Sequence, residues 1–253
     1  MCLIAWNWQP HSDQPLLLIA NRDEYFSRPA LALHWWEQTP VLAGKDLQAG
    51  GTWLGVSRNG RLAALTNFRA AVRDAEVRPS RGALVADFLQ GKMDAGSYLE
   101  AIARKAADYN PFNLLVFDGK QLLGLESRHA HIVHFQPGIS AVSNADFDTP
   151  WPKLVGLKQG LSQHLQQRRL AVPELLPLLQ DATLATDAEL PHTGVPLEWE
   201  RRLSAIKVLS PEYGTRASSI VALGRTGLQF FEQSYDAHGP TQAAEFHFTV
   251  QVD

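Results

Sequence analysis

The sequence predicts an α+β fold in which antiparallel β-sheets pack against helices. Three observations support this prediction. Strand-like segments occur in blocks that can pair with their neighbours, and two blocks of helix-like segments separate them. In addition, 45% hydrophobic and 19% charged residues in a chain of 253 indicate a globular protein with a sizeable core. A four-layer αββα sandwich of two antiparallel sheets satisfies every element, and it is one of several arrangements that the pattern allows. We expect a single domain over residues 1–253.

The chain begins with an expected antiparallel hairpin. The apolar runs Leu3–Trp8 and Leu16–Ala20 are separated by the polar turn HSDQ, as in two paired strands. An irregular stretch is expected next, because Pro29, Pro40 and Gly50 interrupt any regular pattern.

A second hairpin has the clearest local signal. The segments Trp53–Ser57 and Arg61–Thr66 flank the dipeptide Asn59-Gly60. Asparagine and glycine tolerate the positive φ angles of a type I′ turn, so we expect that turn here.

Helices and strands then alternate in blocks. Ser80 is expected to cap a helix over Gly82–Leu89 that ends at Gly91, and Asp94 to cap a helix over Ala95–Asp108. The later strands are expected at Asn113–Phe117, Gln121–Glu126, His131–Phe135, Ile139–Ser143, Ser218–Leu223, Leu228–Ser234 and Glu245–Val252. The later helices are expected at Pro152–Arg169, Pro173–Asp181 and Leu197–Ser204.

Composition restricts the class of protein. The net charge is −3 and no lysine or arginine run is present, which argues against nucleic acid as a partner. Cys2 is the only cysteine, so an intramolecular disulfide is impossible and a reducing compartment is expected. The start of the chain lacks a secretory signal, and apolar runs such as Leu16–Ala20 are too short for a membrane span. We therefore expect a cytoplasmic protein with a small-molecule ligand or substrate.

Six stretches of the sequence carry a family resemblance. They are MCLIAW, ANRDEYFSRPA, GGTWLGVSRNGRLAALTNFR, SRGALVADFL, NPFNLL with SNADFDTPWPK, and LPHTGVPLEWERRLS followed by YGTRASSIVAL. Together they resemble the NRDE-motif family, of the Transport and Golgi organisation type, from the first residue to Leu223. The resemblance implies the fold of N-terminal nucleophile hydrolases, which bile-salt hydrolases and penicillin V acylases share.

The same resemblance makes Cys2 the expected nucleophile. Removal of Met1 would leave Cys2 as the first residue, with a free α-amine of pKa about 8 that can accept the thiol proton. One residue then supplies both nucleophile and base. The structural alternative is that Cys2 is a small buried hydrophobe at the start of a strand.

The NRDE cluster follows the second strand of the first hairpin, so the hairpin should return it to Cys2. Arg22 would favour the thiolate, and Asp23 would orient the amine. Asn21 and Glu24 are expected to contact the substrate. A structural ion pair at the end of the strand is the alternative.

Two alignments with the acylases remain open at this cluster. In the acylases an arginine and an aspartate lie three residues apart. An alignment without gaps puts Asn21 and Glu24 at these positions, whereas a shift by one residue puts Arg22 and Tyr25 there. A shift by one residue on a strand reverses the face, so only one alignment can be right.

Four further residues complete the expected site. By resemblance, Asn67 supplies an amide to the oxyanion hole and Asn144 borders the same pocket. Trp53 and Arg216 are expected to bind the substrate, with Arg216 facing an anionic group or a carboxylate such as Asp23. Asparagine also favours turns at strand ends, which is the alternative for the first two residues.

Two functions fit the resemblance. The first is an amidohydrolase-like enzyme that acts on a small amide or acyl substrate and requires no cofactor. The second is a non-catalytic protein that carries haem or handles acyl-CoA or lipid in an apolar cleft lined by Trp6 or Trp53. In that case haem would be a ligand, held by cysteine or histidine.

No motif indicates a metal or a nucleotide. His129 and His131 share one face of an expected strand, but His134 lies on the other face, and no acidic residue or cysteine completes a metal site. Nucleotide-binding glycine loops and the serine-hydrolase elbow are missing, and Gly224–Gly227 is interpreted as a hairpin turn.

Overall fold

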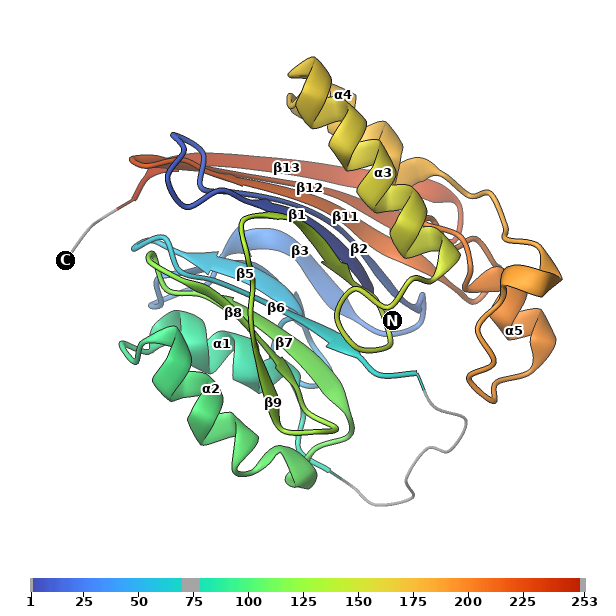
Figure 1. Ribbon diagram of the computed structural model, residues 1–253, viewed down its shortest axis with the longest axis horizontal. Helices are drawn as coiled ribbons and strands as arrows, with labels where there is room; N and C mark the ends of the chain where they lie inside the picture. Colours follow the sequence, from blue (N-terminus) through green and yellow to red (C-terminus); the bar gives the residue numbers. More distant parts are fainter. Residues whose placement is uncertain (1, 70–77, 251–253) are drawn as a thin grey trace.

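The computed structural model describes residues 2–69 and 78–250 and contains two antiparallel β-sheets stacked face to face (Figure 1). The first sheet has the strand order β10-β1-β2-β11-β12-β13, and the second has the order β3-β4-β5-β6-β7-β8-β9. The strands of the first sheet are β1 (Cys2–Trp8), β2 (Leu16–Tyr25), β10 (Gly138–Val142), β11 (Tyr213–Leu223), β12 (Gly227–Asp236) and β13 (Gly239–Thr249). Those of the second are β3 (Ala30–Trp35), β4 (Val41–Asp46), β5 (Leu54–Ser57), β6 (Leu62–Asn67), β7 (Phe112–Phe117), β8 (Leu122–Glu126) and β9 (His131–His134).

Helices cover the outer face of each sheet. The second sheet is covered by α1 (Gly82–Gln90) and α2 (Ala95–Ala103), and the first by α3 (Pro152–Gln167) and the segment after it (Figure 1). The shorter helices are η1 (Ala106–Asp108), α4 (Val172–Leu175), η2 (Leu176–Gln180), η3 (Asp187–Glu189) and α5 (Leu197–Arg202). The layers follow the order helix, sheet, sheet, helix, so the predicted αββα sandwich is confirmed.

Side-chain alternation along β1 shows how one strand serves two cores. Ile4 and Trp6 belong to the core between the sheets, whereas Leu3 and Ala5 pack under α3. Every second side chain therefore enters the same layer. Cys2, two residues before Ile4, is directed toward the space between the sheets.

The prediction of irregular structure around Pro29 and Pro40 is wrong, because β3 and β4 occupy this part of the chain. Each proline directly precedes a strand, Pro29 before β3 and Pro40 before β4. At these positions a missing backbone donor breaks no strand ladder, so the prolines mark strand starts.

The second predicted hairpin is confirmed, but its turn is not type I′. Val56 pairs with Leu62, which leaves a three-residue loop after Ser57. Gly60 alone in this loop has a positive φ, of 76°, and its N–H donates to the carbonyl of Ser57 at 2.9 Å. A type I turn followed by a left-handed glycine has this pattern.

The predicted helix starts were half right. Ser80 does not cap α1, which begins after Arg81 without a side-chain cap. Asp94 does cap α2, where its carboxylate accepts a hydrogen bond from Ser97 N at 2.8 Å. The predicted helix over Ala95–Asp108 was too long, because α2 ends at Ala103 and η1 follows separately.

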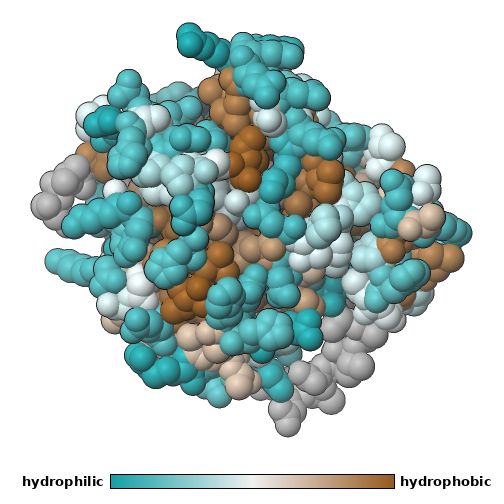
Figure 2. Space-filling view, viewed as in Figure 1, coloured by the Kyte–Doolittle hydropathy of each residue, from teal (hydrophilic) through white to brown (hydrophobic). Residues whose placement is uncertain are grey.

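Most surface in the view of Figure 2 is hydrophilic, with small hydrophobic patches between the polar side chains. This agrees with the packing of the large apolar side chains into separate layers of core. Within residues 2–69 and 78–250, no helix combines the length and hydropathy that a membrane crossing requires.

Candidate functional site

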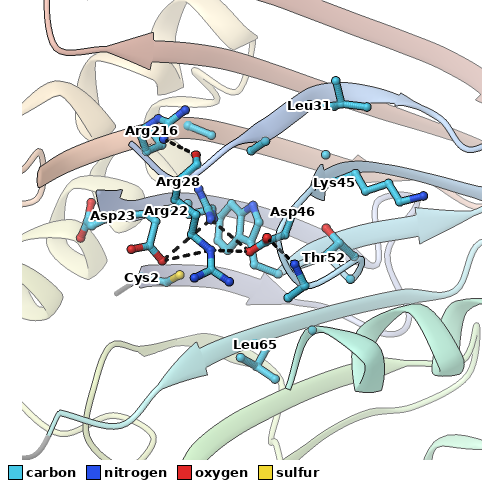
Figure 3. Close-up of a pocket in the computed structure, with 18 of the residues that line it drawn as sticks. Cys2, Arg22, Asp23, Arg28, Leu31, Lys45, Asp46, Thr52, Leu65 and Arg216 are labelled. Atoms are coloured by element: carbon cyan, nitrogen blue, oxygen red, sulfur yellow. Dashed lines mark hydrogen bonds and ion pairs between the residues drawn. The ribbon is translucent and has the colours of Figure 1, made fainter. Parts of the chain in front are cut away.

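A pocket of about 580 Å³ opens between the two sheets beside Cys2 (Figure 3). Both sheets and the segment before α1 line it. The charged residues of its lining are Arg22, Asp23, Glu24, Arg28, Lys45, Asp46, Arg78, Arg81, Arg216, Glu232 and Asp236. The cleft beside Cys2 is therefore more charged than the apolar cleft expected for a carrier, although Leu31, Trp53 and Leu65 also line it. Trp6, expected to line that cleft, is fully buried against Phe135 and Phe147.

Cys2 lies at the inner end of this pocket. Its backbone pairs directly with that of Arg22 on β2, so both side chains lie on the pocket side of the first sheet (Figure 3). Only 6% of Cys2 is exposed, and burial raises the pKa of its thiol to about 11. A thiol with this pKa is protonated at neutral pH, so it requires a base before it can act as a nucleophile.

Four charged residues form a cluster beside Cys2. Arg28 Nε donates to Asp46 Oδ2 at 2.7 Å. Arg22 Nη2 lies 3.9 Å from both Asp46 Oδ2 and Glu24 Oε2, beyond hydrogen-bonding distance. Although burial opposes ionisation, the hydrogen bond from Arg28 holds the pKa of Asp46 below its ordinary value. Arg22 is thus held between two carboxylates and keeps hydrogen-bond donors directed at the pocket.

Asp23 lies on the opposite side of β2 from Arg22, and its carboxylate points away from that guanidinium (Figure 3). Its Oδ1 accepts a hydrogen bond from Thr215 Oγ1 at 2.8 Å. Burial raises the pKa of Asp23, and the nearby positive charge of Lys153 opposes that rise. Asp23 therefore belongs to a buried polar group under the helix layer, and it contributes to the pocket lining only from that side of β2.

Asn21 does not line the pocket. Its amide nitrogen donates to the carbonyl oxygens of Leu179 and Ile206 at 2.8 and 2.9 Å, and its oxygen accepts from Ser218 Oγ at 2.7 Å. All three partners lie on the helix side of the sheet or within it, so Asn21 is directed away from the expected substrate. Of the two alignments considered above, the structure has Arg22 on the pocket side and Asn21 on the other.

Asn67 and Asn144 lie next to each other, but only Asn67 lines the pocket. Asn67 lines the pocket at the end of β6. Asn144 is fully buried and is not part of the lining; its Nδ2 donates to the backbone carbonyl of Asn67 at 2.8 Å. Trp53 lines the pocket and packs partly against the central core.

Arg216 occupies a β-bulge. Thr215 pairs with Asp23 and Ala217 with Arg22, which leaves Arg216 as the extra residue of β11. Its Nη1 donates to backbone carbonyls of the β2–β3 connection, those of Tyr25, Phe26 and Arg28 at 2.9, 3.3 and 3.0 Å. Arg216 lines the pocket, but it fastens the turn after the NRDE segment and does not pair with Asp23 as expected.

Glu232 is a buried carboxyl group in the pocket wall. Its oxygens accept hydrogen bonds from Leu33 N at 2.8 Å and Ser219 Oγ at 3.4 Å. Burial raises its pKa, and the hydrogen bond from Leu33 opposes the rise.

A second charged group lies behind Cys2, on the helix side. Lys153 is at the start of α3 and is buried, with burial lowering its pKa to about 8. Arg69 forms a buried ion pair with Glu200, with 2.7 Å between Nη1 and Oε2, and it also stacks on Trp151 at 4.6 Å. The segment after β6, the start of α3 and α5 therefore meet at this group.

Comparison with known proteins assigns the family. The profile described as Transport and Golgi organisation 2 matches residues 1–237. The Bos taurus Transport and Golgi organization protein 2 homolog is 34% identical over 96% of this chain and 96% of its own length. The Homo sapiens homolog is 34% identical over 97% of this chain and 99% of its own length. The chain belongs to the Transport and Golgi organisation 2 family.

The fold of this Transport and Golgi organisation 2 family member is also found among N-terminal nucleophile hydrolases. The Caenorhabditis elegans N-acylethanolamine-hydrolyzing acid amidase ortholog superposes with a TM-score of 0.54 and covers 87% of this chain and 92% of its own. The identity is 11%, so the likeness concerns the fold. It confirms the fold that the NRDE-motif resemblance implied.

Several charged residues of this family member could not be recognised from sequence. Asp46 and Glu232 reach the pocket from β4 and β12, and Arg28 reaches it from the connection between β2 and β3. Their positions depend on strand pairings that are not local properties of the sequence. Arg28, Lys153 and Arg69 did carry a signal, since all three belong to stretches that identify the family. Lys153 also directly follows the proline that begins α3, where a lysine is electrostatically unfavourable.

Proposed function

We propose that Cys2, exposed as the first residue by removal of Met1, is the nucleophile of an amidohydrolase-like site. The observation that carries the proposal is the position of the Cys2 side chain. It lies in the pocket wall, directly opposite Arg22 in the strand pairing. A nearby guanidinium favours the thiolate form of cysteine. The charged lining suits a small polar amide or acyl compound better than an apolar ligand.

The proposed reaction uses one residue as nucleophile and base. The Cys2 thiol gives its proton to its own α-amine, and its sulfur bonds to the substrate carbonyl carbon. The C–N bond then breaks, the departing amine takes the proton, and a thioester remains on Cys2. Water attacks the thioester and releases the acid, and its proton returns the thiol to its starting form.

Asn67 is the proposed donor to the oxyanion that forms in these steps. Asn67 lines the same pocket, and no described residue forms a hydrogen bond with its side-chain amide. An oriented amide donor in such a site contributes about 3 kcal/mol to transition-state stabilisation. Asn144 would act indirectly, by holding the backbone of Asn67.

Intact-mass measurement of the natively expressed protein tests the proposal. The protein is measured untreated and after reaction with a thiol-reactive acylating probe, with Cys2→Ala as the control. Loss of Met1 together with one rapid adduct that Cys2→Ala lacks would support the proposal.

Retained Met1, or a free Cys2 that does not react, would count against the enzyme. The better proposal would then be the non-catalytic carrier of haem or acyl-CoA. A saturable Soret shift on titration with haem would support the haem form of it.

A further inference from the structure

Lys153 is a buried amine with no hydrogen bond to any described residue. It is 3% exposed, and its Nζ is fully enclosed. Burying an ammonium group without a partner is costly. Its position adds to the cost, since Lys153 lies in the first turn of α3, where the helix dipole also disfavours a positive charge.

Packing places this amine behind Cys2. Leu154 and Leu157 of α3 pack against Leu3 of β1 in one buried cluster, and Figure 1 shows the start of β1 near the start of α3.

Charged and titratable groups face Lys153 from every neighbouring element. They are Asp23 on β2, Cys2 on β1, Arg69 after β6 and Glu200 on α5, with Tyr213 of β11 beside Asp23. Arg69 is already paired with Glu200. Asp23 and Cys2 are therefore the groups whose ionisation the charge of Lys153 can influence.

We propose that Lys153 is a positioning residue of the Cys2 centre, whose ammonium offsets the negative charge of Asp23 and in this way favours the thiolate of Cys2. The inference rests on the proposed function in taking Cys2 as the nucleophile. A positive charge behind the strand stabilises the thiolate and disfavours protonation of an amine at the start of β1. The first effect favours the sulfur as nucleophile, and the second keeps the amine in the neutral form that can accept the thiol proton. This electrostatic effect on Cys2 would explain why the chain buries an ammonium group at this position.

The first test measures how the rate of Cys2 alkylation by iodoacetamide depends on pH. Processed wild-type protein is compared with Lys153→Met, which keeps the side-chain length and removes the charge. The expected result is an upward shift of the midpoint by about 0.5–1 pH unit in the variant. Lys158→Met is the matched control, because Lys158 is on the same helix but lies at the surface beside Asp148. It should leave the midpoint unchanged.

A merely structural Lys153 would leave the alkylation midpoint of Lys153→Met equal to that of Lys158→Met, and this result would overturn the inference. Failure of the proposed function looks different, since Cys2 would then be unreactive in the wild type as well. A second measurement needs neither alkylation nor the Lys153 variant. The Lys153 side chain is titrated by NMR in wild-type protein and in Asp23→Asn. We expect a lower Lys153 pKa in Asp23→Asn, where the negative charge that faces the ammonium is missing, and an unchanged value would also overturn the inference.

Discussion

The side-chain amide of Asn144 donates a hydrogen bond of 2.8 Å to the backbone carbonyl of Asn67. Asn144 follows β10 of the first sheet, whereas Asn67 ends β6 of the second. The bond therefore connects the two sheets where the pocket wall begins. The backbone carbonyl of Asn144 accepts a further hydrogen bond from Arg69 N at 2.7 Å. Asn144 therefore both donates to and accepts from the segment at the end of β6.

Replacement of Asn144 should weaken this connection. Asn144→Ala leaves the carbonyl of Asn67 without its partner in a buried site, while the hydroxyl of Ser143 keeps only the carbonyl of Cys2. We expect a loss of about 1–3 kcal/mol in the free energy of unfolding, measured by urea denaturation. Asn7→Ala, at a more exposed asparagine, should change it by less than about 0.5 kcal/mol. Equal effects of the two substitutions would contradict the structural role of Asn144.

The buried ion pair between Arg69 and Glu200 predicts a larger effect. Arg69→Met leaves the Glu200 carboxylate buried without its cation, which should cost about 3–5 kcal/mol in the free energy of unfolding. The matched control is Arg201→Met, since Arg201 and Asp187 form an ion pair of 2.6 Å at the surface. That substitution should cost less than about 1 kcal/mol. Urea denaturation of both variants measures the difference, and a loss below about 1 kcal/mol in Arg69→Met would refute the prediction.

Local pairing made part of the site predictable. The first hairpin returns along itself, so its register brings Arg22 opposite Cys2, and this neighbourhood follows from the two apolar runs. Which side chains of the NRDE segment face the pocket was not predictable in the same way. On a strand this depends on a register exact to one residue, and the two alignments differed by one.

Residues from distant segments escaped prediction for a different reason. Arg28 and Asp46 meet because β3 and β4 pair at the edge of the second sheet, in a stretch whose prolines suggested irregular structure. Arg216 is turned by a bulge, which has no clear sequence signal. Lys153 was overlooked because a lysine in the first turn of a helix is ordinarily a solvated residue, and only packing shows that this one is enclosed.

Close backbone contact at Gly51 gives a prediction about the pocket wall. A Cβ at this position would lie 2.4 Å from the carbonyl carbon of Gly82, the first residue of α1. Gly51→Ala should therefore displace the start of α1 and cost about 1–3 kcal/mol in the free energy of unfolding. Gly156→Ala is the control, since Gly156 is exposed within α3 and the nearest atom to its added Cβ would be 3.9 Å away. Thermal denaturation should show destabilisation by the first change only; a Gly51→Ala variant as stable as the parent would rule out the contact.

The buried amine of Lys153 makes stability depend on pH in a defined window. Burial lowers its pKa from 10.5 to about 8, so the unfolded chain binds more protons than the folded chain between these values. The free energy of unfolding should therefore rise with pH across this window, by about 3 kcal/mol. Lys153→Met should lack this contribution and should be more stable than the wild type near pH 7, because the cost of burying the Lys153 ammonium is removed.

Urea denaturation of the wild type, Lys153→Met and Lys158→Met between pH 7 and pH 10.5 measures this contribution. Between about pH 8 and 10.5 the stability advantage of Lys153→Met over the wild type should shrink as Lys153 loses its proton in the folded state. Lys158→Met should follow the wild type, since Lys158 is at the surface. A constant difference between Lys153→Met and the wild type over the whole range would mean that Lys153 titrates at its ordinary pKa, and the amine would then not be enclosed as the structure has it.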